Sequence, residues 1–98
     1  MKYILSKNKD REIKDKSIKT EFKMVNGFVL RYDLYHSSDG YITSYHIKTT
    51  KIVCGNIEEE AWVHNFEWRK KEAQNIFETI IRGEVTPHCL EDCVLELI

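Results

Sequence analysis

The 98-residue chain is long enough for one modest hydrophobic core, and its 42% hydrophobic and 11% aromatic residues argue against disorder although 32% of the residues are charged. Its apolar runs are too short to cross a membrane, its N-terminal stretch is too polar for a signal peptide, and three cysteines are too few for a disulfide scaffold. We therefore expect a single domain over residues 1–98, located in the cytoplasm, with reduced thiols.

The net charge of −1 hides an uneven distribution along the chain. Residues 1–24 contain eight basic and four acidic residues, whereas residues 57–98 contain four basic and ten acidic residues. A basic head and an acidic tail can attract each other within one molecule, between subunits, or through a partner. The simpler interpretation is that the lysines protect exposed strand edges from aggregation.

The clearest strand signal is a hairpin in the first third of the chain. Residues 2–6 are a plausible short strand, and the polar stretch 7–19 is expected to be a loop or a solvated hairpin. Alternation then begins at residue 21 and resumes after Asn26-Gly27, a pair that favours a type I′ turn between two strands. Both faces of the strand over residues 28–35 carry apolar side chains.

Two more strands follow this hairpin. Residues 37–40, Ser-Ser-Asp-Gly, have the composition of a turn, and residues 41–47 are rich in β-branched and aromatic residues. A further turn at residues 54–56 leads to a last strand over residues 61–66.

The C-terminal third has the periodicity of two short helices. From Glu67 onward, one apolar stripe recurs at helical spacing, at Ala73, Ile76, Phe77, Ile80 and Ile81. Asn65 is a candidate N-cap, and Gly83 stands where a left-handed residue commonly ends a helix. Thr86 and Pro87 predict the cap and the first position of the second helix. The expected fold class is α+β, with an antiparallel β-meander of about four strands followed by two C-terminal helices.

The segment Ile81-Arg82-Gly83-Glu84-Val85-Thr86-Pro87-His88-Cys89-Leu90-Glu91-Asp92 resembles a family of roughly hundred-residue proteins from spore-forming anaerobic bacteria. That family is known only as a domain of unknown function, and the resemblance extends mainly over residues 61–98. A glycine typical of its middle strand is replaced here by Asp33. The resemblance implies an α+β fold and no activity.

Candidate catalytic and metal-binding groups are few. Cys89 and Cys93 share a helix face next to His88, a spacing compatible with zinc ligation or with an activated thiol. Free cysteines are more often buried packing residues, and no orienting or oxyanion group accompanies these two. We therefore expect no enzyme, no metal and no cofactor.

The favoured function is a non-enzymatic regulatory or adaptor module that acts through protein–protein contacts and self-associates, as a homodimer. The predicted sheet carries more apolar surface than two short helices can cover, and four aromatic side chains are candidates for a contact patch: Tyr35, Tyr41, Trp62 and Trp68. A simpler interpretation is that the two tryptophans close the core where strand meets helix.

The alternative is a sequence- or plasmid-associated DNA-binding accessory protein, because a strand followed by two helices has the order of a ribbon-helix-helix or winged-helix-like unit. Its contacts to phosphate would come from the N-terminal segment and the first helix, namely from Lys14, Lys16, Lys19, Lys23, Arg69, Lys70 and Lys71. The acidic second helix argues against this alternative because it would repel phosphate.

Overall fold

The computed structural model describes residues 17–39 and 41–98. In chain order the elements are β1 (Lys19–Val25), β2 (Phe28–Asp39), β3 (Ile42–Val53), β4 (Asn56–Glu67), α1 (Lys70–Arg82), the short 3-10 helix η2 (Pro87–Cys89) and α2 (Leu90–Leu97). The strands form one antiparallel sheet in the order β1-β2-β3-β4. The predicted α+β class, with a four-stranded meander and two C-terminal helices, is confirmed. The predicted strand over 2–6 lies outside the described residues, as do residues 7–16 of the predicted loop, whereas Lys19 already belongs to β1.

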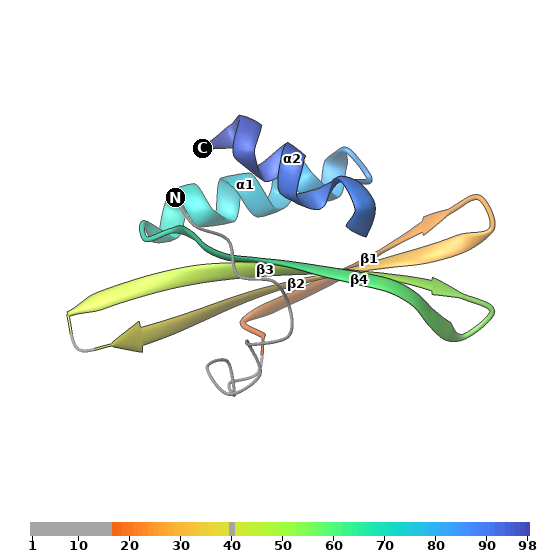
Figure 1. Ribbon diagram of the computed structural model, residues 1–98, viewed down its shortest axis with the longest axis horizontal. Coiled ribbons are helices and arrows are strands. Elements are labelled where there is room, and N and C mark those ends of the chain that lie inside the picture. Colours follow the sequence, from red (N-terminus) through yellow and green to blue (C-terminus); the bar gives the residue numbers. More distant parts are fainter. Residues whose placement is uncertain (1–16, 40) are drawn as a thin grey trace.

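Both helices lie on the same face of the sheet (Figure 1). Strand side chains alternate between the two faces, and on β2 Leu30, Tyr32 and Leu34 face the helices and are fully buried. In the same core cluster are Ile47 of β3, Val63 of β4 and the predicted stripe of α1. The other sheet face, called the open face below, carries no helix of the described chain.

Three polar contacts join β1 and β2 to the helical layer. The hydroxyl of Tyr32 donates to the carbonyl of Val85, in the connection between α1 and η2, at 3.0 Å. The ammonium groups of β1 reach carboxylates on the helical side, as Lys19 pairs with Glu78 and Lys23 pairs with Glu84, each at 3.7 Å.

The predicted start of the first helix is wrong by three residues. Strand β4 continues to Glu67, and α1 begins at Lys70 with Arg69 in the cap position. Asn65, the predicted cap, instead has a positive φ of 56° in a β-bulge, where three residues of β4 stand opposite His46 alone. An asparagine tolerates both a left-handed bulge and an N-cap, so its residue type does not distinguish the two.

The predicted ends of the helices are partly right. Gly83 follows α1 as expected, and its N–H donates to the Thr79 carbonyl, but its φ is −84° and the left-handed residue is Glu84, at 53°. Thr86 and Pro87 do start the second helical segment, which opens as one 3-10 turn before α2 begins at Leu90.

The turns differ from the sequence prediction in two respects. Strand β2 continues to Asp39, so residues 37–39 of the predicted Ser-Ser-Asp-Gly turn belong to the strand. At Asn26-Gly27 the positive φ, 91°, belongs to Gly27 only, so the predicted type I′ turn, which needs two positive φ values, is wrong there. The turn after β3 has the type I′ signs instead, with 52° at Cys54 and 82° at Gly55.

Candidate interaction surfaces

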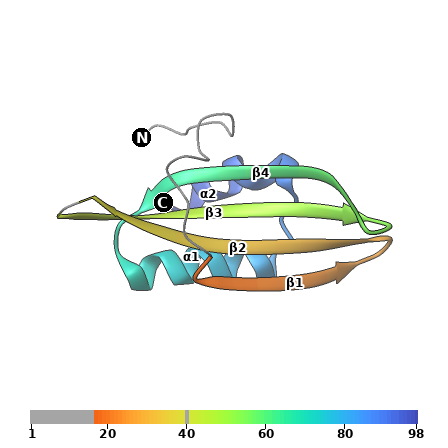
Figure 2. The same ribbon diagram turned by 90° about the horizontal axis from the view of Figure 1, so that it is seen from below.

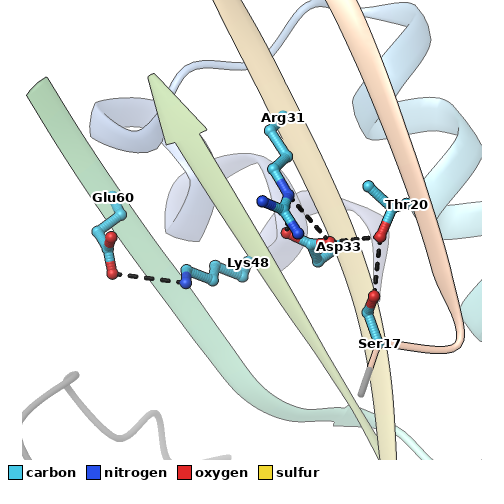
Figure 3. Close-up of polar contacts among 6 residues, drawn as sticks. All are labelled: Ser17, Thr20, Arg31, Asp33, Lys48 and Glu60. Carbon is cyan, nitrogen blue, oxygen red and sulfur yellow. Dashed lines mark hydrogen bonds and ion pairs between the residues drawn. The ribbon is translucent and has the colours of Figure 1, made fainter. Parts of the chain in front are cut away.

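The charged groups on the open face belong to short-range networks (Figure 3). The buried carboxylate of Asp33 accepts a hydrogen bond from the Thr20 hydroxyl at 2.6 Å and pairs with Arg31 at 3.1 Å. Lys48 and Glu60 form a second pair at 3.7 Å. The hydrogen bond from Thr20 to Asp33 therefore links the start of β1 to β2, so the role of Asp33 is structural.

An aromatic cluster lies beside these networks. The rings of Tyr35 and Trp62 are 5.0 Å apart, and the Trp62 indole stacks on the His64 imidazole at 5.0 Å with 10° between the planes. His64 in turn lies 5.3 Å from His46. Tyr35 and Trp62, two of the predicted contact residues, are half-buried, and their rings contact other members of this cluster.

His46 is the polar centre of the cluster and is 3% exposed. Its Nδ1 accepts the backbone N–H of Asn65 at 3.1 Å, so the neutral ring carries its proton on Nε2, which lies 2.9 Å from the Ser37 hydroxyl oxygen. Burial lowers the pKa of His46 to about 4, and the neighbouring imidazoles of His64 and His36 add to the effect. The neutral ring thus stabilises the bulge in β4.

A different apolar surface lies at the edge of the sheet, where the β2–β3 hairpin extends beyond the end of β4 (Figure 2). Here an open hollow of about 450 Å³, called the corner hollow below, is lined by Ile42, Ser44, Asn65, Phe66, Glu67, Trp68 and Ile98. Three of these residues expose large apolar side chains: Ile42 is 64% exposed, Trp68 69% and Ile98 49%. The carboxylate of Glu67 beside them pairs with the guanidinium of Arg69, so the charge of Glu67 is already compensated. The same guanidinium lies over the Trp68 ring, 5.6 Å from its centroid.

The four predicted contact aromatics therefore do not form one patch. Tyr35 and Trp62 lie on the open face, Trp68 lines the corner hollow, and the fully exposed Tyr41 directly precedes Ile42 of the hollow. The sequence prediction missed Ile42 and Ile98, which are far apart in the sequence and meet only through the fold.

Of the five basic residues proposed for nucleic-acid binding that the structure describes, three form ion pairs within the chain. Lys14 and Lys16 lie outside the described residues, and Lys19, Lys23 and Arg69 are paired with Glu78, Glu84 and Glu67. Lys70 and Lys71 are exposed at the start of α1.

The cysteines and histidines do not gather into a metal site within residues 17–39 and 41–98, where no group of three or more His, Cys, Asp or Glu is placed to hold an ion. Cys89 is exposed, and Cys93 packs partly buried against the core, where burial raises the pKa of its thiol. No helix in the described part of the chain is long and apolar enough to cross a membrane.

Comparison of the chain with protein-family models, with curated proteins and with solved structures finds no match. The resemblance drawn from residues 61–98 stays a prediction. The surfaces of the molecule are therefore the guide to its function.

Proposed function

We propose that the chain is a non-enzymatic adaptor or regulatory module that binds an extended segment of a partner protein in the corner hollow and also associates with itself. The observation that carries the proposal is the grouping of Ile42, Trp68 and Ile98 around one concavity, where each residue is between 49% and 69% exposed to water. Exposed apolar surface gathered in one place is typical of a protein contact site, whereas single exposed apolar residues are ordinary.

The composition of the corner hollow supports a protein ligand. Tryptophan and arginine are enriched among residues that contribute most to protein–protein affinity, and here Trp68 is backed by Arg69. The Arg69–Glu67 bond, with Nε and Oε2 2.8 Å apart, holds the guanidinium over the ring, which reduces the side-chain entropy lost on binding.

The backbone next to the hollow supports an extended ligand. The last pair between β3 and β4 is Tyr45 with Glu67, so β3 residues 42–44 have a strand partner on the β2 side only, within the described chain. A peptide that lies along this edge gains main-chain hydrogen bonds while its alternate side chains enter the hollow.

A displayed library of random peptides tests the proposal without any assumption about which protein is the partner. We expect selection on the wild-type chain to enrich peptides with apolar residues at alternate positions, and these peptides to lose at least roughly tenfold in affinity for Trp68→Ser and for Ile42→Ser. Leu95→Ser, which removes an exposed apolar side chain on α2 outside the hollow, is the matched control and leaves the affinity unchanged.

Two results would contradict the proposal. One is a selection that enriches no peptide over background. The other is an enriched peptide whose affinity is the same for wild type and for Trp68→Ser, with both variants folded by circular dichroism.

The DNA-binding alternative has narrower support. It depends on Lys70 and Lys71, which are exposed and lie in the first turn of α1, beside the carboxylate of Glu72. Two lysines next to an acidic residue offer few contacts to DNA phosphates and a weakly positive surface. DNA binding through these two lysines is therefore a second proposal, which gel shifts with duplex DNA test.

A further inference from the structure

We propose that two copies of the chain pair antiparallel through β1, with Phe22 opposite Phe22 of the second copy, to form one continuous eight-stranded sheet. This inference deepens the proposed function by naming one partner, a second copy, and it rests on that proposal. The surface involved is separate from the corner hollow, so each can be tested by itself.

Strand β1 is an edge of the described sheet and has regular backbone geometry. It pairs with β2 on one side over all seven residues without a bulge, and no strand of the described chain lies on its other side (Figure 2). Because the hairpin loop Asn26-Gly27 has two residues, Val25 and Phe28 form a hydrogen-bonded pair, and the pattern alternates from there. The N–H and C=O groups of the even-numbered residues Thr20, Phe22 and Met24 therefore point away from β2.

The charges on β1 select one register for a second copy. Outward-pointing residues must stand opposite outward-pointing residues, so allowed registers differ by steps of two. With Phe22 opposite Phe22, Glu21 of each copy stands opposite Lys23 of the other, giving two pairs of opposite charge. A step in one direction places Glu21 opposite Glu21 and Lys19 opposite Lys23, and a step in the other places Lys23 opposite Lys23.

The same register brings apolar side chains together on the open face. Phe22 is 59% exposed and Met24 79% exposed, and each would be covered in part, Phe22 by its own equivalent and Met24 by Thr20 of the second copy. The contact is isologous, so it closes on a two-fold axis and does not propagate into a filament.

The lysines of β1 do not block this edge. Their side chains point to the helical layer, where Lys19 and Lys23 pair with Glu78 and Glu84. Edge protection by lysine works when the ammonium stands in the way of a neighbouring strand. The side chain of Thr20 lies on the open face, where its hydroxyl is bonded to Asp33, so it does not block the edge either.

Charge exchange across the two-fold axis tests the register. Sedimentation of the full chain over a concentration series measures the dimer constant. Glu21→Lys places two lysines opposite each other, and Lys23→Glu places two glutamates opposite each other, so we expect each variant alone to dimerise at least roughly tenfold more weakly. An equimolar mixture of the two variants, and the variant that carries both changes, restore dimerisation because opposite charges face each other again.

Phe22→Pro tests the backbone pairing. It removes an outward-pointing N–H that the β1–β2 pairing does not use, and proline is tolerated at such edge positions. We expect an unchanged circular dichroism spectrum and loss of the dimer, whereas Leu95→Ser leaves the dimer intact.

The inference is overturned if the wild-type chain is monomeric at every concentration up to about 1 mM, or if it dimerises equally well as Glu21→Lys and as Phe22→Pro. A monomer that still binds the selected peptides refutes the β1 dimer and the self-association in the proposed function, and it leaves peptide binding in the corner hollow standing. A dimer that the charge changes weaken, but that binds no peptide, supports the β1 dimer and refutes peptide binding in the corner hollow.

Discussion

Acid destabilisation centred on His46 gives a quantitative test of how the open face is built. The ring is buried and its Nδ1 accepts the Asn65 N–H, so protonation would remove an acceptor and place a charge in a poorly hydrated site. Burial therefore lowers the pKa of His46 from 6.5 to about 4 in the folded chain.

The sign and size of the effect follow from linkage. Below pH 6.5 the unfolded chain takes up a proton on this histidine that the folded chain does not, so stability is full above pH 6.5 and falls as the pH falls towards 4. Each pKa unit corresponds to about 1.4 kcal/mol, which gives a loss of roughly 2 kcal/mol at about pH 5 and roughly 3 kcal/mol once both states are protonated.

The assay is urea unfolding of wild type and of His46→Asn at about pH 7.5 and pH 5, together with an NMR titration of the His46 ring. Asparagine keeps an acceptor near the Asn65 N–H but does not titrate, so we expect its stability to fall by roughly 2 kcal/mol less than that of wild type over this interval. A His46 ring that titrates near 6.5, or equal pH slopes for the two chains, would refute the reasoning.

Three further predictions concern the fold and the alternative function. Tyr32→Phe removes the hydroxyl that ties β2 to the connection after α1, and we expect a loss of about 1–2 kcal/mol in the free energy of unfolding, measured by urea unfolding. Gly27→Ala forces a side chain onto a φ of 91°, and we expect it to lower the free energy of unfolding by about 1 kcal/mol. Gly83→Ala has a φ of −84° and ordinary contacts for the added Cβ, and we expect it to raise the free energy of unfolding by about 0.5 kcal/mol. Equal shifts in melting temperature for the two variants would contradict this contrast. In gel shifts at about 50 mM salt we expect no binding of duplex DNA, and a shift that disappears in Lys70→Ala and Lys71→Ala would favour the DNA-binding alternative.

The sequence predicts the architecture well because local patterns determine it. Alternation over residues 28–35 and the helical stripe from Ala73 to Ile81 record which side chains face the core, and the structure confirms both. Alternation over residues 21–25 marks a strand but not its core face, because Phe22 and Met24 lie exposed on the open face. Asn26-Gly27 and Cys54-Gly55-Asn56 also interrupt the alternation where the structure has turns. The composition of residues 37–40 predicts a turn as well, but β2 continues there to Asp39.

The details that failed depend on tertiary contacts. Asn65 is drawn into a bulge by a hydrogen bond to His46, which lies on the neighbouring strand, and no local pattern contains that information. The corner hollow is similar, since it needs Ile42, Trp68 and Ile98 from three separate parts of the chain. The charge asymmetry was visible in the sequence, but only the fold shows that Lys19 and Lys23 meet acidic groups of the helical side.

Site-specific photo-crosslinking in cells tests the adaptor proposal most directly. A photoreactive residue in place of Trp68 reports on the corner hollow, and one in place of the exposed Glu91 on α2 is the control. We expect a discrete crosslinked partner at position 68 that is absent at position 91 and is lost when Ile42→Ser is added. Crosslinking that is absent at position 68, or that persists unchanged with Ile42→Ser, would contradict the proposal.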